Sequence, residues 1–176
     1  MLIIRFSSLG DMVLLTSLIG ALRDARPNAE IHLATKAEYA EVFENDPRLN
    51  RIHVLREGNL SELMKLRSEL SSESFDTVID AHGSIRSIFL YRTLRAPSKA
   101  RIEKDQLRKT AMIKMGIRPV LDGRSMVDRY LDLAERLGIG ARGTPPRLEI
   151  PEEATERAGD LLSGIPGVKC LIAMAP

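Results

Sequence analysis

The chain has 176 residues, of which 44% are hydrophobic and only 4% aromatic, with no Trp. This composition fits one soluble domain with an aliphatic core and disfavours a surface that stacks nucleic-acid bases. The net charge of +2 is uneven, because residues 86–124 carry 11 basic and 3 acidic side chains and the rest of the chain is therefore acidic. Such asymmetry indicates either a surface for an anionic partner or a set of solvated helix faces.

Strands and helices are expected to alternate along the chain. Apolar runs predict strands at residues 3–6, 30–34, 52–55, 77–79 and 98–102. Apolar residues at helical spacing predict helices at 11–26, 60–71, 85–94 and 126–137, a further helix ending near Asn45, and a basic helix that begins at Glu103. This order predicts an α/β fold, a Rossmann-like parallel sheet with helices on both faces.

No targeting segment is expected. The apolar run at residues 1–6 contains Arg5 and is too short for a signal sequence or a membrane span, so it is interpreted as a buried strand. The single cysteine, Cys170, has no partner for an internal disulfide and lies in an apolar run. We therefore expect a cytoplasmic protein, or one on the cytoplasmic side of a membrane.

Ligands of parallel sheets bind beyond the carboxyl ends of the strands. Two predicted turns have suitable chemistry there, residues 7–11 (SSLGD) and residues 80–84 (DAHGS). Neither turn contains the dinucleotide fingerprint G-x-G-x-x-G or a phosphate-binding P-loop.

The first turn has two interpretations. Ser8 and Asp11 match a capping box, in which both residues satisfy the start of a helix, and local considerations favour this interpretation. Alternatively, Gly10 leaves space for a ligand beside the strand end, and the carboxylate of Asp11 serves as a general base.

The second turn is similarly open. His82 either binds substrate or forms a hydrogen bond with a nearby backbone group, and Ser84 is a plausible N-cap. Asp80 and His82 are conceivable metal ligands, but no other His or Cys completes a site, so no metal is expected.

Both turns lie in segments that resemble the glycosyltransferase family containing the lipopolysaccharide heptosyltransferases. The resemblance rests on residues 2–14 (LIIRFSSLGDMVL) and 75–87 (FDTVIDAHGSIRS), with weaker similarity at 127–130 (VDRY), 137–138 (LG) and 170–176 (CLIAMAP). It implies a GT-B transferase, whose N-terminal domain holds the acceptor and whose C-terminal domain holds the nucleotide sugar. Residues 1–164 would then be the acceptor-binding domain, and 165–176 the linker and first strand of a donor-binding domain that the chain lacks.

The resemblance also implies a reaction and a site. Heptose would pass from ADP-L-glycero-D-manno-heptose to the inner core of lipopolysaccharide with inversion, and Asp11 would be the catalytic base. The implied acceptor-binding residues are Ser7, Ser8, Gly10, His82, Gly83, Arg86, Arg101, Lys104 and Arg108. No metal or cofactor is implied in this chain, because the absent domain would hold the ADP group.

The partner implied by the resemblance is an anionic glycolipid at the cytoplasmic face of the inner membrane, to which the enzyme would bind peripherally. Such an acceptor would account for the basic stretch, in which Lys104 and Arg108 share one helix face. By itself the chain is expected to fold but to show no transferase activity and no micromolar affinity for ADP. The alternatives are a nucleotide-binding α/β domain of another enzyme, such as an oxidoreductase, and a non-catalytic basic module that binds membranes or nucleic acid.

Overall fold

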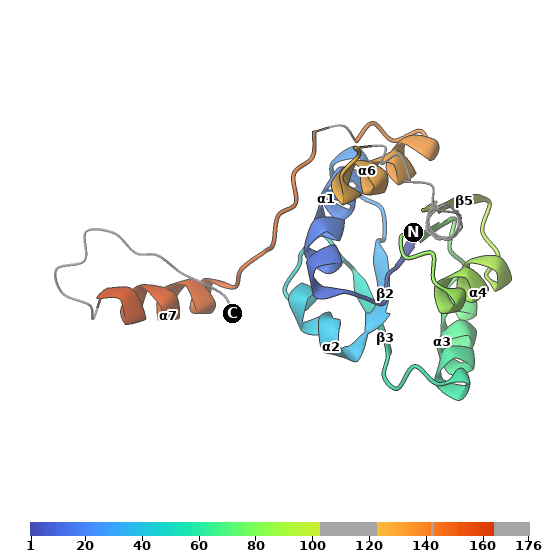
Figure 1. Cartoon of the computed structure of the whole chain (residues 1–176), viewed down its shortest axis with the longest axis horizontal. Coiled ribbons are helices and arrows are strands. Elements are labelled where there is room, and N and C mark those ends of the chain that lie inside the picture. The colour runs from blue at the N-terminus through green and yellow to red at the C-terminus, as the bar shows by residue number, and fades with distance from the viewer. Residues whose placement is uncertain (103–122, 142, 164–176) are drawn as a thin grey trace, which may run out of the picture.

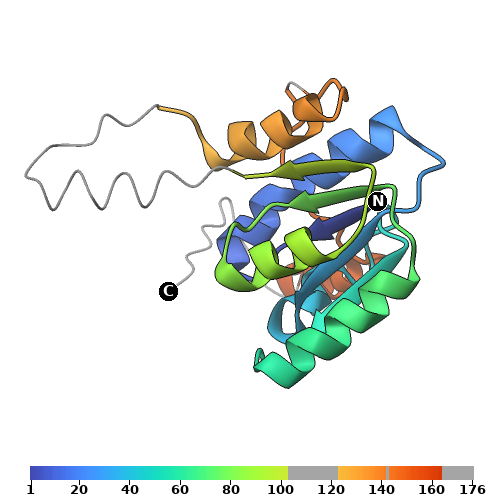
Figure 2. The same cartoon turned by 90° about the vertical axis from the view of Figure 1, so that its right-hand side faces the viewer.

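A computed structural model describes residues 1–102, 123–141 and 143–163. Its centre is a five-stranded parallel sheet with the order β3-β2-β1-β4-β5 (Figures 1 and 2). The strands are β1 (Leu2–Ile4), β2 (His32–Lys36), β3 (Arg51–Leu55), β4 (Thr77–Asp80) and β5 (Ser98–Arg101). The chain builds outward from β1 to β3 and then crosses to β4 on the other side of β1. The turns after β1 and β4 are therefore neighbours at the point where the strand order reverses.

Helices cover both faces of the sheet, as the sequence predicts. The helices are α1 (Leu9–Ala25), α2 (Ala37–Ala40), the 3-10 turn η1 (Glu41–Phe43), α3 (Leu60–Ser72), α4 (Ile85–Thr93), α6 (Met126–Arg136) and α7 (Glu152–Ser163). Helices α1 and α6 pack together over one face, and α3 and α4 pack over the other (Figure 1).

The buried side chains form one cluster on each face of the sheet. Side chains of a strand alternate between faces, so Ile3 joins the cluster under α1 and α6, whereas Leu2 and Ile4 join the cluster under α3 and α4. All three are fully buried, as expected for the central strand of a parallel sheet covered on both sides.

Most predicted elements form with shifted ends. The predicted strand at 3–6 becomes Leu2–Ile4, although the backbone N–H of Arg5 still donates to Ala34 O at 3.0 Å. The strand predicted at 30–34 forms at His32–Lys36. Helix α1 begins at Leu9 rather than residue 11, because Ser8 is its N-cap. The predicted basic helix from Glu103 and the strand at 170–176 lie outside the described residues.

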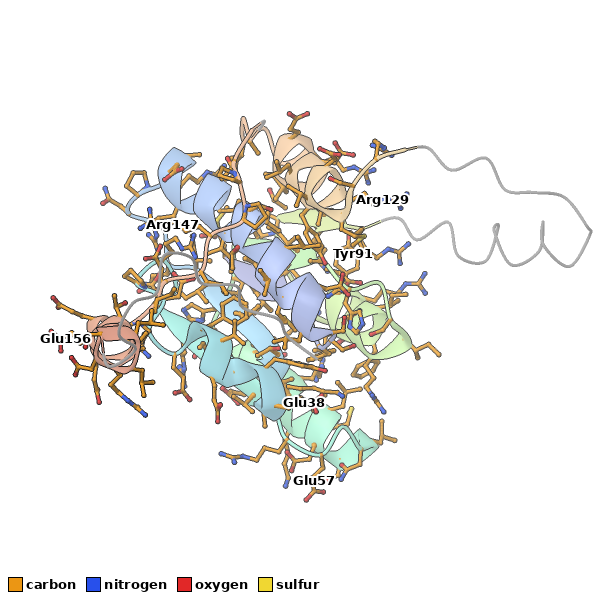
Figure 3. The ribbon with its side chains drawn as sticks, turned by 60° about the vertical axis from the view of Figure 1, so that its left-hand side comes forward. Glu38, Glu57, Tyr91, Arg129, Arg147 and Glu156 are labelled. Carbon is orange, nitrogen blue, oxygen red and sulfur yellow. The ribbon has the colours of Figure 1, made fainter. Side chains whose placement is uncertain are left out.

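The segment that follows α6 is tied to α1. The backbone N–H of Arg147 donates to Thr16 Oγ1 at 2.9 Å, and Arg48 donates to the carbonyl of Arg147 at 2.7 Å. Beyond it, α7 stands apart from the sheet with every residue exposed, including Glu156 (Figures 1 and 3). Among the described helices, none combines the length and apolarity needed to cross a bilayer.

A chain of polar contacts links β2, β3 and α3, from the buried His32 and His53 to the exposed Glu69. His32 Nδ1 lies 3.0 Å from His53 Nε2, and His53 Nδ1 lies 2.5 Å from Glu69 Oε1. Both imidazoles are nearly inaccessible and meet the ring of Phe75 edge-on. Burial, reinforced by the nearby His53, lowers the pKa of His32.

Candidate active site

The two turns singled out in the sequence meet at the carboxyl edge of the sheet. Ile4 is in register with Asp80, and the backbone N–H of Ala81 donates to the carbonyl of Ile4 at 3.1 Å. Residues 7–11 and 80–84 are therefore adjacent, although about seventy positions separate them in the sequence. This is the place in an open parallel sheet where ligands bind.

The first turn ends in the carboxylate of Asp11. Its Oδ2 accepts hydrogen bonds from the backbone N–H of Ser8 at 3.3 Å and from the Ser8 hydroxyl at 3.1 Å. The predicted capping pair at the start of α1 therefore forms. About a quarter of the Asp11 side chain is exposed, at 27%, so the carboxylate is also accessible from the turn.

A buried arginine lies beneath Asp11. Nη2 of Arg5 forms an ion pair with the same Oδ2, and Nη1 donates to the carbonyl of Ala81 at 2.7 Å. Arg5 is only 3% exposed, and its guanidinium lies 5.6 Å from the ring centroid of Tyr130. Since burial strengthens the interaction between charges, this pair ties Asp11 to the sheet.

Tyr130 closes the site from α6. The residue is fully buried, and its hydroxyl has no hydrogen-bond partner in the part of the chain that the structure describes. Burial raises the pKa of Tyr130, with the charge of Asp11 adding to the effect and that of Arg5 opposing it. The buried phenol and the Arg5–Asp11 ion pair therefore form one polar group beneath the turn.

The second turn is shaped by Asp80, which is fully buried. Its Oδ1 accepts the backbone N–H groups of His82 at 3.0 Å and Gly83 at 2.8 Å. Gly83 has a φ of +64°, a conformation that favours glycine. Ser84 then caps α4, as predicted, and accepts the backbone N–H of Ser87 at 3.3 Å. Asp80 thus has a structural role in the turn.

His82 joins the two turns. Its Nδ1 accepts the backbone N–H of Phe6 at 3.3 Å, which places the proton of the neutral imidazole on Nε2. Nε2 in turn lies 3.4 Å from the hydroxyl of Ser7. His82 therefore forms the hydrogen bond with a nearby backbone group that the sequence offered as one alternative. It also contacts Ser7 in the first turn.

Gly10 faces open space. A methyl group built on its Cα would meet no described atom within 4 Å, so packing does not require glycine here. This supports the interpretation that Gly10 leaves room for a ligand above the first turn of α1.

The predicted basic residues lie in different places. Arg86 is exposed at the start of α4, and its guanidinium lies beside Gly58, where an added Cβ would be 3.6 Å from Arg86 Cζ. Arg101 ends β5 in register with Asp80, and its guanidinium lies 5.9 Å from the ring centroid of Tyr91 on α4, which Figure 3 labels. Lys104 and Arg108 lie outside the described residues.

Exposed apolar side chains lie at the same edge of the sheet as the two turns. Leu9, Leu60 and Ile85 begin α1, α3 and α4, and their exposed fractions are 54%, 72% and 90%. Each helix follows the carboxyl end of a parallel strand, so these residues belong to the same edge of the sheet as Asp11.

Other features do not add to this site. The described residues contain no group of three or more His, Cys, Asp or Glu side chains placed to hold a metal ion. A cavity of about 690 Å³ lies at the opposite, amino edge of the sheet, between the ends of α3 and α4, with Arg67 and Arg95 in its lining.

Sequence analysis missed Arg5 and Tyr130 as parts of the site. Arg5 could have been found from the sequence, because it is a charged residue in a predicted buried strand and comes just before a predicted ligand-binding turn. Tyr130 gave no comparable signal, since an apolar helix position is usually a core residue.

Comparisons with known proteins point to one family and one fold. A family model described as glycosyltransferase family 9 (heptosyltransferase) matches residues 63–174. Curated proteins gave no match. Among solved structures, a glycosyl transferase family 9 protein from Veillonella parvula superimposes with a TM-score of 0.72 at 23% identity, over 93% of this chain and 49% of that chain.

Two Escherichia coli structures are also similar. Heptosyltransferase WaaC with ADP gives a TM-score of 0.64 at 21% identity, over 82% of this chain and 49% of that chain. ADP-heptose lps heptosyltransferase II gives a TM-score of 0.66 at 21% identity, over 92% of this chain and 50% of that chain. At these identities the superpositions establish the fold, and the chain spans about half the length of the structures it matches.

Proposed function

Because the chain belongs to glycosyltransferase family 9, the heptosyltransferase family, we propose that it is the acceptor-binding half of a two-domain inverting glycosyltransferase. The enzyme transfers heptose from ADP-L-glycero-D-manno-heptose to the inner core of lipopolysaccharide. The observation that carries this proposal is the position of Asp11, a partly exposed carboxylate where the turns after β1 and β4 meet. Residues 1–164 form this half in the proposal, and residues from 165 onward lead into the donor-binding half.

Asp11 acts as the general base. The acceptor hydroxyl attacks the anomeric carbon of the donor as the bond from that carbon to the diphosphate oxygen breaks. The hydroxyl proton passes to the Asp11 carboxylate, and the bonding electron pair leaves with ADP. Attack from the face opposite the leaving group inverts the anomeric configuration. A carboxylate within hydrogen-bond reach makes an otherwise weak nucleophile effective.

The acceptor lies along the carboxyl edge of the sheet. Its sugars contact the turn formed by Ser7, Ser8 and Gly10 and the turn formed by His82 and Gly83. Its phosphates and carboxylates meet the guanidinium of Arg86, and the basic residues Arg101, Lys104 and Arg108 extend the same attraction. The exposed side chains of Leu9, Leu60 and Ile85 support contact with the lipid surface that carries the acceptor.

A transfer assay tests the proposed reaction. The two-domain enzyme is incubated with ADP-heptose and a heptose-deficient inner-core acceptor, and the product is examined by proton NMR. We expect a new glycosidic bond of inverted anomeric configuration. Absence of transfer with every heptose-deficient acceptor, or retention of configuration, would reject the proposal.

The assignment of the donor to the other half is tested on this chain alone. Calorimetric titration with ADP should give no saturable binding in the micromolar range, because neither turn contains a phosphate-binding loop. One-to-one micromolar binding would place the donor site in this half. A nucleotide-binding domain of an oxidoreductase would instead bind NAD(P), which a parallel titration with NAD(P) detects.

Membrane association is tested with vesicles. We expect the chain to sediment with vesicles of anionic phospholipid and to be released by salt, since basic residues and exposed apolar side chains share one edge. Equal recovery with neutral and anionic vesicles would show that charge does not direct the association.

A further inference from the structure

We infer that Arg5 is the positioning residue for Asp11, fixing the carboxylate so that one oxygen is presented to the acceptor hydroxyl. This inference rests on the proposed function. It concerns a residue that does not reach the substrate, because Arg5 is buried beneath the turn at 3% exposure.

Arg5 is itself held from three sides. Its backbone N–H donates to Ala34 O on β2, and its Nη1 donates to Ala81 O in the turn after β4. The ring of Tyr130, from α6, lies 5.6 Å from its Cζ. These contacts come from parts of the chain far apart in sequence, so the folded core determines where the guanidinium lies.

The fixed guanidinium constrains the two carboxylate oxygens of Asp11 differently. Arg5 and both donors of Ser8 all bind Oδ2. Within the described residues, Oδ1 accepts no hydrogen bond, and the side chain is partly exposed. A rotation that brought Oδ2 to the substrate would break three interactions, so Oδ1 is the oxygen that receives the proton.

The shape of the guanidinium matters as well as its charge. Arginine presents several N–H donors in a fixed plane, which lets it bind Ala81 O and Asp11 at once. Lysine carries the same charge on a single nitrogen, so it cannot bind the two acceptors through two separate nitrogens as the guanidinium does. Misplacing a catalytic group by about 1 Å can reduce the rate by two orders of magnitude.

The test compares kinetic constants in the two-domain enzyme. Arg5→Met should lower kcat at least about tenfold while KM for acceptor and donor changes less than about twofold, because positioning acts on the reacting geometry rather than on binding. Arg5→Lys should give an intermediate kcat. Arg23→Met is the matched control: Arg23 lies on the same helix as Asp11 and donates to the carbonyls of Arg48, Pro27 and Ala29, far from the turn.

The outcomes separate this inference from the proposed function. Loss of activity in Asp11→Asn together with a near-normal kcat in folded Arg5→Met would overturn the role of Arg5 and leave the base in place. A kcat loss in Arg23→Met equal to that in Arg5→Met would show a general effect of destabilising α1 and would also overturn it. If Arg5→Met does not fold, Arg5→Lys carries the test, and a wild-type kcat in that variant rejects the inference.

Discussion

The hydroxyl of Ser8 donates to Oδ2 of Asp11 at 3.1 Å, so the carboxylate that caps α1 is the same one that faces the turn. Capping and proton transfer are therefore compatible roles, since the capping contacts use Oδ2 and the side chain is 27% exposed. The cap places the carboxylate and limits its motion, which is what a general base requires.

Replacing Asp11 by Asn should lower turnover of the two-domain enzyme by about a hundredfold or more, because an amide cannot accept the proton. The fold should persist, since Ser8 remains the N-cap of α1 and the amide oxygen of Asn can still accept hydrogen bonds from Ser8. The buried guanidinium of Arg5 loses its counter-charge, so the free energy of unfolding should fall by about 1–3 kcal/mol. Steady-state kinetics and chemical denaturation measure the two effects.

The control for this variant is a second capping pair of the same kind. At the start of α6, the hydroxyl of Ser125 donates to Asp128 at 2.8 Å and its backbone N–H donates at 2.9 Å, on an exposed surface. Asp128→Asn should therefore weaken a helix cap without slowing transfer. Near-wild-type turnover in Asp11→Asn would remove Asp11 from the role of base.

Replacing Gly10 by Ala should stabilise the protein and impair the enzyme. An added Cβ meets open space, and Ala is favoured over Gly in a helix by about 0.5–1 kcal/mol. The same methyl group occupies the space proposed for the acceptor, so KM for the acceptor should rise. Gly159 in α7 is similarly open, and Gly159→Ala serves as control. An unchanged acceptor KM in Gly10→Ala would argue that the acceptor does not approach this turn.

Replacing both Lys104 and Arg108 by Ala should weaken binding of the anionic acceptor and make that binding less sensitive to salt, because two attractive charges are lost. Donor affinity in the two-domain enzyme should stay constant. The matched control is Arg67→Ala with Arg95→Ala, which removes the same charge at the opposite edge of the sheet. Equal weakening of donor and acceptor binding would indicate a structural role for the pair.

Stability should fall on acidification through the buried imidazole of His32. Its pKa is lowered in the folded state from a model-compound value of 6.5, so the unfolded chain binds the proton first. The free energy of unfolding should therefore decrease as the pH falls below about 6.5, until the folded-state pKa is reached. His53 next to it disfavours the charge, while Glu73 and Glu30 oppose that effect.

Denaturation of His32→Gln over the range from about pH 7 to pH 5 tests this effect, since the variant should lose stability less steeply than wild type. Glu38→Gln is the control, because its hydrogen bond with Lys36 lowers the pKa of Glu38 and keeps its titration below this range. Parallel pH profiles for His32→Gln and wild type would show that His32 does not contribute.

The alternation of strands and helices, the two-sided core and the two chemically suitable turns were accessible from the sequence. Apolar periodicity and helix caps are local properties, and residues such as Ser8 and Ser84 lie where their local patterns predict. Strand ends were less accurate, as at β2, because the end of a strand depends on its pairing partners as well as on its own side chains.

The assembly of the site was decided by the tertiary structure. The strand order places Ile4 beside Asp80, and only then can His82 reach Phe6 and Arg5 reach Ala81, contacts that span 76 residues in each case. A hydrogen bond depends on distance and direction in space, and no local pattern specifies a partner so remote. The sequence alone determined which chemical groups are available. The packing of α1 and α6 on the sheet decided that Arg5 is buried and that it forms an ion pair with the partly exposed Asp11.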